Sequence, residues 1–360
     1  MNHHFPRALR RRPTVWLLAL VLTLCSATAL ADKPRFDVAH NKLVHGLYQA
    51  AYSERNDVLY VTSAVGRPPI RQSQLLKVDP QTLQVLASTT PPTVAEGKPG
   101  LYAVYGVDVD DAHGTVWVTN TRQDTVAVYD QDDLSLRKQF AEGTVAHSRD
   151  VIVDAKRGKA YASAVSGGYV AVFDTATLKL VKRIPLLPEG ADGTFAPASL
   201  ALNAADGKLY VPDLKTPRVA VIDTASDTVD KLIALPGAES AIGVAWDGAH
   251  HRVLVTAQKS HNLLVVDPLS GKVVHDVAVG AGALNVAFDP VSGLAFVSNR
   301  KAGTIAVVDP ASGERVARLD GGTYPNHVAV DGKGHVFAIN KSHGADDPEG
   351  DRVMRLTPAS

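Results

Sequence analysis

The sequence predicts an all-β fold, a seven-bladed β-propeller built from four-stranded blades. Three observations predict it: a β-branched segment ending in Asp recurs every 42–51 residues, a second strand-like segment precedes each copy, and turn residues separate the strands. Four short strands in a period of ~40–50 residues are typical of propeller blades rather than of a sandwich or a parallel α/β sheet. No segment shows a sustained helical period with caps.

The first landmark is an alternating strand that ends in Asp. Its copies are LLKVDP to Pro80, VAVYD to Asp130, VAVFD to Asp174, VAVID to Asp223, LLVVDP to Pro268, IAVVDP to Pro310 and the degenerate VMRLTP to Pro358. Measured at the Asp, and at Thr357 in the last copy, the spacings are 51, 44, 49, 44, 42 and 48 residues.

The second landmark lies upstream of each copy. It reads LYVTS from Leu59, VWVTN from Val116, AYASA from Ala160, LYVPD from Leu209, VLVTA from Val253, AFVSN from Ala295 and VFAIN from Val336. The fifth residues of these segments are 57, 44, 49, 44, 42 and 41 residues apart. Two landmarks therefore give seven copies in the same phase.

Each copy also has a strand upstream of both landmarks, such as GVAWD from Gly243, and one downstream, such as LKLVKRI from Leu178. The seventh copy lacks the downstream strand before Ser360, whereas the segment from Arg35 to His40 belongs to no other copy. We predict that this N-terminal strand completes blade seven, because a closed ring leaves no open sheet edge at the junction.

The first 31 residues have the pattern of a secretory signal peptide. An apolar run from Val15 to Leu24 is followed by small residues ending in Ala31, and it is preceded by Arg7, Arg10, Arg11 and Arg12. This pattern predicts export to the periplasm with cleavage after Ala31, so that residues 32–360 form a single propeller domain. The run is shorter than the about 20 residues of a membrane helix, so we expect no membrane insertion of the mature chain.

Two other export signals fit less well. A lipoprotein signal at Cys25 would need a small residue where Leu24 stands, and a twin-arginine signal at Arg11-Arg12 would need apolar residues where Pro13 and Thr14 follow. Cleavage after Ala31 removes the only cysteine, which leaves no disulfide and no cysteine metal site.

Charge gives no global reason to expect nucleic acid or an anionic membrane as partner. The whole chain holds 37 basic and 37 acidic residues, and loss of the four arginines before position 32 leaves a formal charge of −4. The distribution of charge over the two faces of the propeller is therefore more informative than its sum.

The VTN, VSN and VVDP segments resemble the YVTN-repeat, WD40-like family of β-propellers. GLYQAAYSERNDVLYVTSA from Gly46 and YPNHVAVDGKGHVFAINKS from Tyr324 are similar to YncE-like periplasmic propellers, over essentially the whole mature chain. The resemblance implies a non-enzymatic binding module. Some members are associated with single-stranded DNA and others with outer-membrane metal uptake, and no catalytic motif carries over.

One face of the predicted ring collects acidic residues in the hairpins that join strands one to two and three to four. They are Asp57, Asp110, Asp111, Asp154, Asp206, Asp247, Asp289 and Asp331 in the first hairpins, and Asp79, Asp130, Asp174, Asp223, Asp267 and Asp309 in the second. We interpret them as turn-formers, because Asp hydrogen-bonds its own backbone in turns.

The opposite face carries the loops between strands two and three and the links between blades. Its loops hold Arg67, Arg71, Arg122, Lys215, Lys259, Arg300, Lys301 and Lys341, and its links hold Tyr102, Tyr105, His147, Arg149, Tyr324 and His327. Turns do not require Arg or Lys, and a basic rim with aromatic side chains suits anions or single strands. An ordinary solvated surface is the alternative.

The last loop on this face, SHGADDPEGDR from Ser342, inserts Asp346, Asp347, Glu349 and Asp351 into the basic rim. It lacks the alternating spacing of a Ca²⁺ loop, so we interpret it as a surface insertion rather than as a cation site.

No G-x-S-x-G, H-E-x-x-H, C-x-x-C-H or P-loop pattern occurs. His147 and His327 are weak metal candidates because both are expected near the channel entrance, but two histidines do not make a complete site. A metal-handling protein or enzyme with a site built on His147, Asp150, Asn285, Asn326 and His327 is the alternative function.

We therefore predict a monomeric, cofactor-free binding scaffold in the periplasm, with no catalytic residue. Its basic loop face and channel mouth are expected to capture an anionic ligand, single-stranded DNA or a periplasmic or outer-membrane protein. The candidate ligand-binding residues are Tyr102, Tyr105, Arg122, His147, Arg149, Asn285, Arg300, Tyr324, Asn326, His327 and Lys341.

Overall fold

The computed structural model describes residues 1–4, 34–94, 97–344 and 346–359. Contacts group the residues from Pro34 onward into one compact unit, separate from Met1–Lys33. Apart from its first four residues, the predicted signal peptide with its cleavage site after Ala31 lies outside the described residues.

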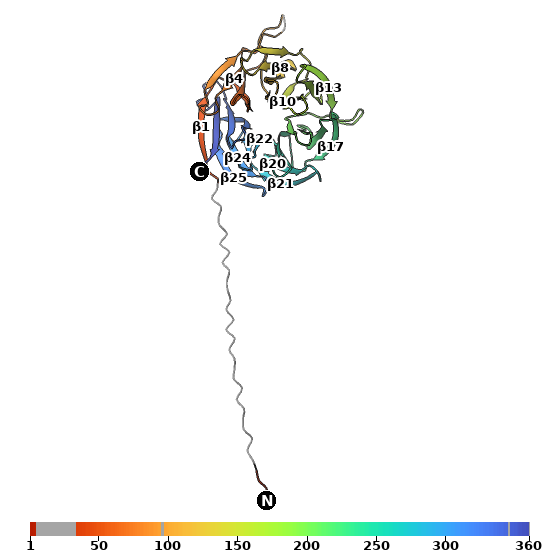
Figure 1. The fold of residues 1–360 in the computed structure, drawn as a ribbon, viewed down its shortest axis with the longest axis vertical. Coiled ribbons are helices and arrows are strands. Elements are labelled where there is room, and N and C mark those ends of the chain that lie inside the picture. The colour runs from red at the N-terminus through yellow and green to blue at the C-terminus, as the bar shows by residue number, and fades with distance from the viewer. Residues whose placement is uncertain (5–33, 95–96, 345, 360) are drawn as a thin grey trace. The chain divides into compact units, whose positions relative to one another are not determined.

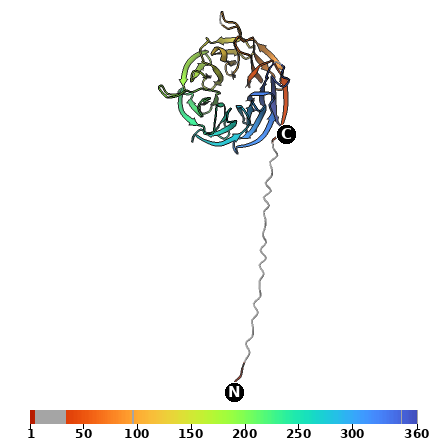
Figure 2. The same ribbon diagram turned by 180° about the vertical axis from the view of Figure 1, so that it is seen from behind.

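The unit from Pro34 onward is a ring of seven antiparallel sheets, each with four strands, around a central channel. The chain passes once around the ring, so that sequence order and blade order agree (Figures 1 and 2). The predicted seven-bladed propeller is confirmed. Among the described residues no helix is long and apolar enough to cross a membrane.

The strands of blades one to four, from the channel outward, are β2 (Leu47–Ser53), β3 (Val58–Val65), β4 (Gln72–Val78), β5 (Val85–Thr89); β6 (Val107–Asp110), β7 (Thr115–Asn120), β8 (Thr125–Asp130), β9 (Leu136–Gln139); β10 (Ser148–Asp154), β11 (Lys159–Ala164), β12 (Tyr169–Asp174), β13 (Lys179–Pro185); β14 (Ala201–Asn203), β15 (Lys208–Pro212), β16 (Arg218–Asp223), β17 (Thr228–Ala234). A short 3₁₀ turn, η1 (Thr121–Gln123), follows β7.

The strands of blades five to seven, in the same order, are β18 (Ala241–Asp247), β19 (Arg252–Ala257), β20 (Asn262–Asp267), β21 (Lys272–Ala278); β22 (Ala283–Asp289), β23 (Leu294–Asn299), β24 (Thr304–Asp309), β25 (Glu314–Asp320); β26 (Tyr324–Val330), β27 (Val336–Lys341), β28 (Arg352–Pro358), β1 (Phe36–Lys42).

The ring is closed by the N-terminal strand, as predicted. β1 pairs antiparallel with β28 from Phe36 opposite Pro358 to Lys42 opposite Arg352, and it lies at the outer rim beside the blue C-terminal blade in Figure 1. The strand begins one residue and ends two residues later than the predicted segment Arg35–His40. Blade seven therefore combines both ends of the ring in one sheet.

The two middle strands of each blade form the core. In β7 and β8 every residue is buried, whereas most residues of the outer strand β13 are exposed. Large side chains of the middle strands, including Tyr60, Trp117, Tyr161 and Phe296, fill the spaces between blades. This burial on both faces explains why the middle strands are rich in β-branched and aromatic residues.

The hairpin aspartates form turns, as interpreted from the sequence. Asp79 Oδ1 accepts the backbone N–H groups of Gln81 at 2.9 Å and Thr82 at 2.7 Å. Asp223 Oδ1 accepts those of Ala225 and Ser226 in the same way. The acidic hairpin face is therefore first a consequence of turn chemistry.

Candidate functional site

β-Bulges in the innermost strands determine which side chains face the channel mouth. The pairing of β10 with β11 shifts register between Ser148 and Val151, which leaves Arg149 and Asp150 outside the regular ladder. The same shift in β2 releases Tyr48 and Gln49. A bulge bends its strand and redirects the side chains it carries, so these positions differ from the regular inward and outward alternation.

A hydroxyl group of the second landmark holds each of these bulges. Thr119 Oγ1 accepts the backbone N–H of Gly106 at 2.8 Å and donates to the carbonyl of Arg149, in the next blade, at 3.3 Å. Equivalent hydroxyls accept from the bulged strand at Thr62, Ser163, Thr256 and Ser298. Thr62 and Thr256, like Thr119, also donate to a carbonyl of the next blade, so the recurring Thr joins neighbouring blades.

A cavity of about 120 Å³ lies at the channel mouth on the loop face. Predicted site residues that line it are Tyr105, Arg122, His147, Arg149, Asn285, Arg300, Asn326 and His327. It is also lined by Tyr48, Gln49, Thr121 and Leu284, which were not among the candidates. The structure therefore brings together residues from blades one, two, three, six and seven.

The remaining candidates lie beside this cavity or away from it. The Lys341 ammonium is 4.0 Å from the centroid of the Tyr48 ring, and the Arg300 guanidinium is 4.9 Å from that of Tyr324. Tyr102 does not line the cavity: it is buried, and the charges that act on its hydroxyl are Glu142 and Lys98. Lys341 and Tyr324 thus extend the site, and Tyr102 does not.

Two cations flank a pair of tyrosines along one side of the mouth. Tyr48 meets Tyr105 edge to face, with ring centroids 4.6 Å apart. Arg122 Nε donates to the Tyr105 hydroxyl at 3.3 Å. With Lys341 over Tyr48, the arc runs continuously from blade seven through blade one to blade two, and each cation is held against a ring or its hydroxyl.

The positive groups of the mouth lack carboxylate partners. Among the described residues no Asp or Glu oxygen lies within 4.0 Å of the cationic nitrogens of Arg122, Arg149, Arg300 or Lys341. Arg149 Nε is buried and has no hydrogen-bond partner there. Burial lowers the pKa of Arg149, and burial with the nearby Arg300 charge lowers that of Lys341 to about 8. An anion in the cavity would offset the free-energy cost of holding these positive charges close together and out of water.

Both histidine candidates line the cavity, but their surroundings do not favour a metal ion. His327 Nδ1 accepts the backbone N–H of Ala50 at 3.4 Å, and burial and the Arg149 charge lower its pKa to about 3. Burial also lowers the pKa of His147. Within the described part of the chain no three His, Cys, Asp or Glu side chains form a group suited to a metal ion, and the guanidinium groups oppose a further cation.

The polar residues of the alternative site are used to join blades. Asp150 Oδ2 accepts the N–H of Leu200 at 3.0 Å, and Asn285 Oδ1 accepts that of Val328 at 2.9 Å. Asn326 Nδ2 donates to the carbonyl of Tyr48 at 2.7 Å. Each of these side chains satisfies a backbone group on the unpaired edge of the next innermost strand, which a propeller would otherwise leave open.

Deeper in the channel, two carboxyl groups lie among protein atoms with limited hydration. Asp108 Oδ2 accepts the N–H of Val153 at 2.7 Å, and burial raises the pKa of this carboxyl to about 7. Burial likewise raises the pKa of Asp150 to about 6, against the opposing effects of the Leu200 N–H and the Arg149 charge. The channel is therefore cationic at its mouth and carries carboxyl groups below it.

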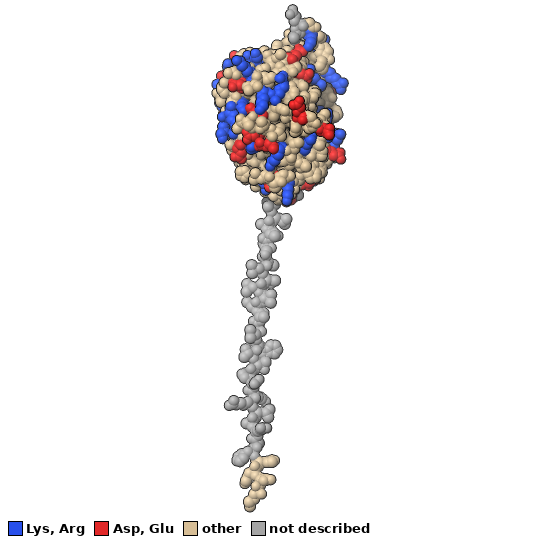
Figure 3. All heavy atoms as spheres, turned by 90° about the vertical axis from the view of Figure 1, so that its right-hand side faces the viewer, with Lys and Arg blue, Asp and Glu red and all other residues tan. Residues whose placement is uncertain are grey.

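The wider basic rim is not one continuous patch. Lys215 Nζ donates to Thr194 Oγ1, and Arg71 lines a different cavity together with His45. In the 342–352 loop, Asp347 accepts the N–H groups of His343, Glu349 and Gly350. The side view in Figure 3 shows blue and red groups interspersed over the wall of the propeller. The cations of the mouth differ from those of the rim because Arg122, Arg149 and Arg300 line one common cavity.

Sequence reasoning missed Tyr48, Gln49 and Leu284 because they lie in bulges that it did not anticipate, and it missed Thr121 in the turn η1. The signal was present in the repeat phase: Tyr48 and Gln49 directly follow the first residue of an innermost strand, as do Arg149 and Asp150 in blade three. Gln49 and Asp150 occupy equivalent positions, because each donates its N–H to the repeat hydroxyl. Aligning the innermost strands on this position would have identified Tyr48, but it would not have shown which residues lie next to Tyr48 in space.

No family model matches the chain. YncE of Salmonella typhi is 26% identical over 277 residues, which cover 74% of this chain and 73% of the relative. YncE of Escherichia coli strain K12 is 26% identical over 274 residues, which cover 73% and 72%. Both agree with the resemblance inferred from the repeats.

Solved structures share the fold. A catalytically inactive form of virginiamycin B lyase from Staphylococcus aureus, with quinupristin, aligns with a TM-score of 0.71 and 12% identity over 90% of this chain and 100% of that chain. The hydrazine synthase of Kuenenia stuttgartiensis aligns with a TM-score of 0.68 and 14% identity over 89% and 98%. At such identities the likeness concerns the fold, which does not decide function.

Proposed function

We propose that this YncE-like β-propeller is a periplasmic binding scaffold that captures an anionic ligand at the mouth of its channel, without catalysing a reaction. The observation that carries the proposal is the group of guanidinium and ammonium groups around one cavity, with no carboxylate at ion-pair distance among the described residues. A folded protein does not normally keep such charges close together and unpaired unless a ligand or solvent compensates them.

Arg149 is the central residue of the proposed site. Its guanidinium is surrounded by protein, its Nε has no partner among the described residues, and its position is held by the bulge of β10. Arg122 and Arg300 line the same cavity from blades two and six. Planar guanidinium groups that approach from several sides suit an oxyanion such as a phosphate or a carboxylate.

The tyrosines extend this preference to ligands that carry rings. Tyr48, Tyr105 and Tyr324 lie next to the cations, and bases of a single strand stack on such side chains while phosphates meet Arg and Lys. Single-stranded DNA is therefore the polyanion we propose to test first. A protein partner would present its own carboxylates to the same cavity.

The test is binding of a fluorescent oligothymidine to the mature protein across a salt series, with inorganic phosphate as competitor. We expect affinity that falls steeply with salt, because displaced counterions are released on binding, and competition by phosphate. Binding that is insensitive to salt and phosphate would contradict capture at the cationic mouth. No binding at low salt would exclude DNA and direct the same test to carboxylate-rich peptides.

A further inference from the structure

A second cavity, of about 370 Å³, lies between blades four and five toward the hairpin face, and it shares no lining residue with the channel mouth. Its wall is largely apolar and aromatic, formed by Tyr210, Val221, Trp246, Pro268 and Leu269. Its rim is polar, formed by Asn203, Asp206, Lys208, Asp230, Lys231 and His251. An apolar pocket with a few polar groups is the usual form of a small-molecule site.

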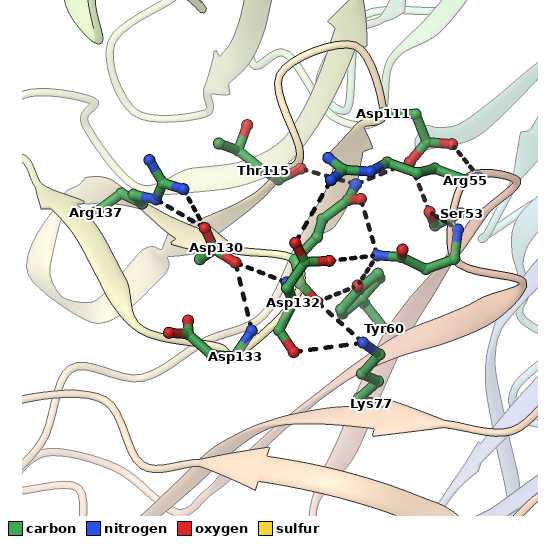
Figure 4. Close-up of polar contacts among 12 residues, drawn as sticks. Ser53, Arg55, Tyr60, Lys77, Asp111, Thr115, Asp130, Asp132, Asp133 and Arg137 are labelled. Carbon is green, nitrogen blue, oxygen red and sulfur yellow. Dashed lines mark hydrogen bonds and ion pairs between the residues drawn. The ribbon is translucent and has the colours of Figure 1, made fainter.

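The repeat provides internal comparisons, because two other junctions have a tyrosine at the same strand position. Between blades one and two, the Tyr60 hydroxyl, labelled in Figure 4, donates to the Gln131 carbonyl at 2.7 Å. The Gln131 side chain is fully buried, and its Nε2 donates to Asp111 at 2.8 Å. Between blades three and four, the Tyr161 hydroxyl donates to Asp227 Oδ1 at 3.0 Å. Both junctions are closed by polar side chains of the following blade.

The junction between blades four and five is left open. Pro268 follows Asp267 where Gln131 follows Asp130, and its carbonyl accepts from Lys231 Nζ at 2.5 Å. The Tyr210 hydroxyl has no hydrogen-bond partner among the described residues. The next residue, Leu269, is 88% exposed beside the cavity rather than packed into it.

The aromatic wall is pre-formed. The rings of Tyr210 and Trp246 are stacked with centroids 5.6 Å apart and planes 12° from parallel, and His251 meets Trp246 with centroids 6.0 Å apart. A ligand would therefore find the rings in place and would not need to order them, which favours binding.

The rim offers both hydrogen-bond donors and acceptors, and its positive and negative charges are equal in number: Lys208 and Lys231, and Asp206 and Asp230. Lys208 Nζ is fixed between Asp223 at 2.8 Å and Asp230 at 2.6 Å. Asp206 Oδ2 accepts from Asn203 at 3.0 Å and has further acceptor capacity. Because two carboxylates face two ammonium groups, neither a cationic nor an anionic ligand has an advantage.

We propose that this cavity binds a neutral sugar, as a mono- or disaccharide. A sugar ring has an apolar C–H face that packs against Tyr and Trp, and its hydroxyl groups both donate to carboxylates and accept from ammonium and phenol groups. Its size also suits the cavity, which lies in the lower part of the range of about 300–1,000 Å³ for ligand pockets.

The test uses the intrinsic fluorescence of the mature protein with a panel of neutral mono- and disaccharides, followed by calorimetry. Trp117 and Trp246 are the tryptophans of residues 32–360, and Trp117 is fully buried elsewhere, so a saturable change reports on Trp246. We expect one class of sugar to give this change, and Trp246→Phe to abolish the optical signal.

Two variants separate binding from folding. Tyr210→Phe removes a hydroxyl without a protein partner, so we expect affinity to fall roughly fivefold, as for one lost hydrogen bond, with an unchanged Tm. The matched control Tyr161→Phe removes a hydroxyl that is bonded to Asp227, so it should lower Tm and leave the sugar affinity unchanged.

Three outcomes would overturn the proposal. One is the absence of any saturable response to the panel at concentrations up to about 10 mM, which lies beyond useful affinity. Another is sugar binding that Tyr210→Phe and Asp206→Asn leave unchanged. The third is binding of aromatic amines in the same cavity without binding of sugars.

Discussion

The Lys341 ammonium lies over the Tyr48 ring, 4.0 Å from its centroid, so the last blade contacts the first at the rim of the channel. This contact joins the cations of blade seven to the tyrosine arc of blades one and two. It also places an amine whose pKa is lowered to about 8 next to the proposed anion site, where its charge varies near neutral pH.

Anion affinity should fall as pH rises from 7 to 9. Burial and Arg300 lower the pKa of Lys341 to about 8, so the ammonium loses its proton in this window, and an anion favours the protonated form. We expect a fall of up to about tenfold, measured by calorimetry, with proton uptake near pH 8. Lys341→Arg should flatten this dependence because guanidinium stays charged. An equal pH dependence in both proteins would contradict the role of Lys341.

Asp108→Asn should stabilise the protein at pH 8 and have little effect at pH 4.5. Burial raises the pKa of Asp108 in the folded state to about 7, above the ordinary value of an aspartate in the unfolded chain. The wild-type protein therefore loses stability as pH rises from that ordinary value through about 7. The expected gain at pH 8 is on the order of 1 kcal/mol, because channel solvent screens the ionised form. Thermal unfolding at both pH values tests it. Equal changes in Tm at the two pH values would be inconsistent with a buried, protonated carboxyl group.

Thr119→Val should destabilise the fold and weaken anion binding together. The substitution leaves the buried N–H of Gly106 without its acceptor and releases the carbonyl of Arg149, at a cost of about 1–3 kcal/mol. Thr115→Val is the matched control, since the buried Thr115 hydroxyl has no partner among the described residues, and it should be neutral or stabilising. Urea unfolding of both variants gives the comparison. Similar losses for the two would refute the bulge-holding role.

Asp351→Ala should loosen the ring closure. Asp351 Oδ1 accepts the N–H of Gly46 at 2.8 Å, and Oδ2 lies 2.6 Å from His45 Nδ1, so one carboxylate links the C-terminal blade to the start of blade one. We expect a loss of about 2–3 kcal/mol and faster proteolysis at the seam.

The exposed neighbour Asp346 provides the control for the closure prediction, and Asp346→Ala should change stability by less than about 0.5 kcal/mol. Burial raises the pKa of Asp351, but hydrogen bonds from His45, Ser342 and Gly46 outweigh it, so the net pKa is lowered. The stabilisation is therefore present above the ordinary pKa of an aspartate and is lost in more acidic solution. If Asp351→Ala had the stability and proteolysis rate of the wild type, the β1–β28 pairing alone would account for closure of the ring.

The repeat made the fold predictable in detail. The common phase of the two repeated strand segments predicted seven blades. The strand missing from the last copy indicated that Arg35–His40 would complete it, as β1 does. Local chemistry was sufficient here, because turns and alternating strands are encoded residue by residue.

The site was predictable only in part. Loop and link positions identified Arg122, His147 and Arg300 on the correct face, since topology alone assigns a loop to a face. Tyr48 was missed because a bulge turns it toward the mouth, and Tyr102 was included although it is buried beside Glu142. The positions of the Tyr48 and Tyr102 side chains depend on register shifts and on packing between blades, which the periodicity of the sequence does not reveal.

The most direct test of the proposed anion-binding mouth compares oligothymidine affinity in three forms of residues 32–360: wild type and two triple variants. One variant carries Arg149→Ala, Arg300→Ala and Lys341→Ala. The other carries Lys138→Ala, Lys179→Ala and Lys272→Ala, which removes the same charge from exposed positions of outer strands. We predict a loss of at least about 100-fold in the first and less than about threefold in the second at low salt. Equal losses in the two variants would show that general charge, and not the channel mouth, binds the anion.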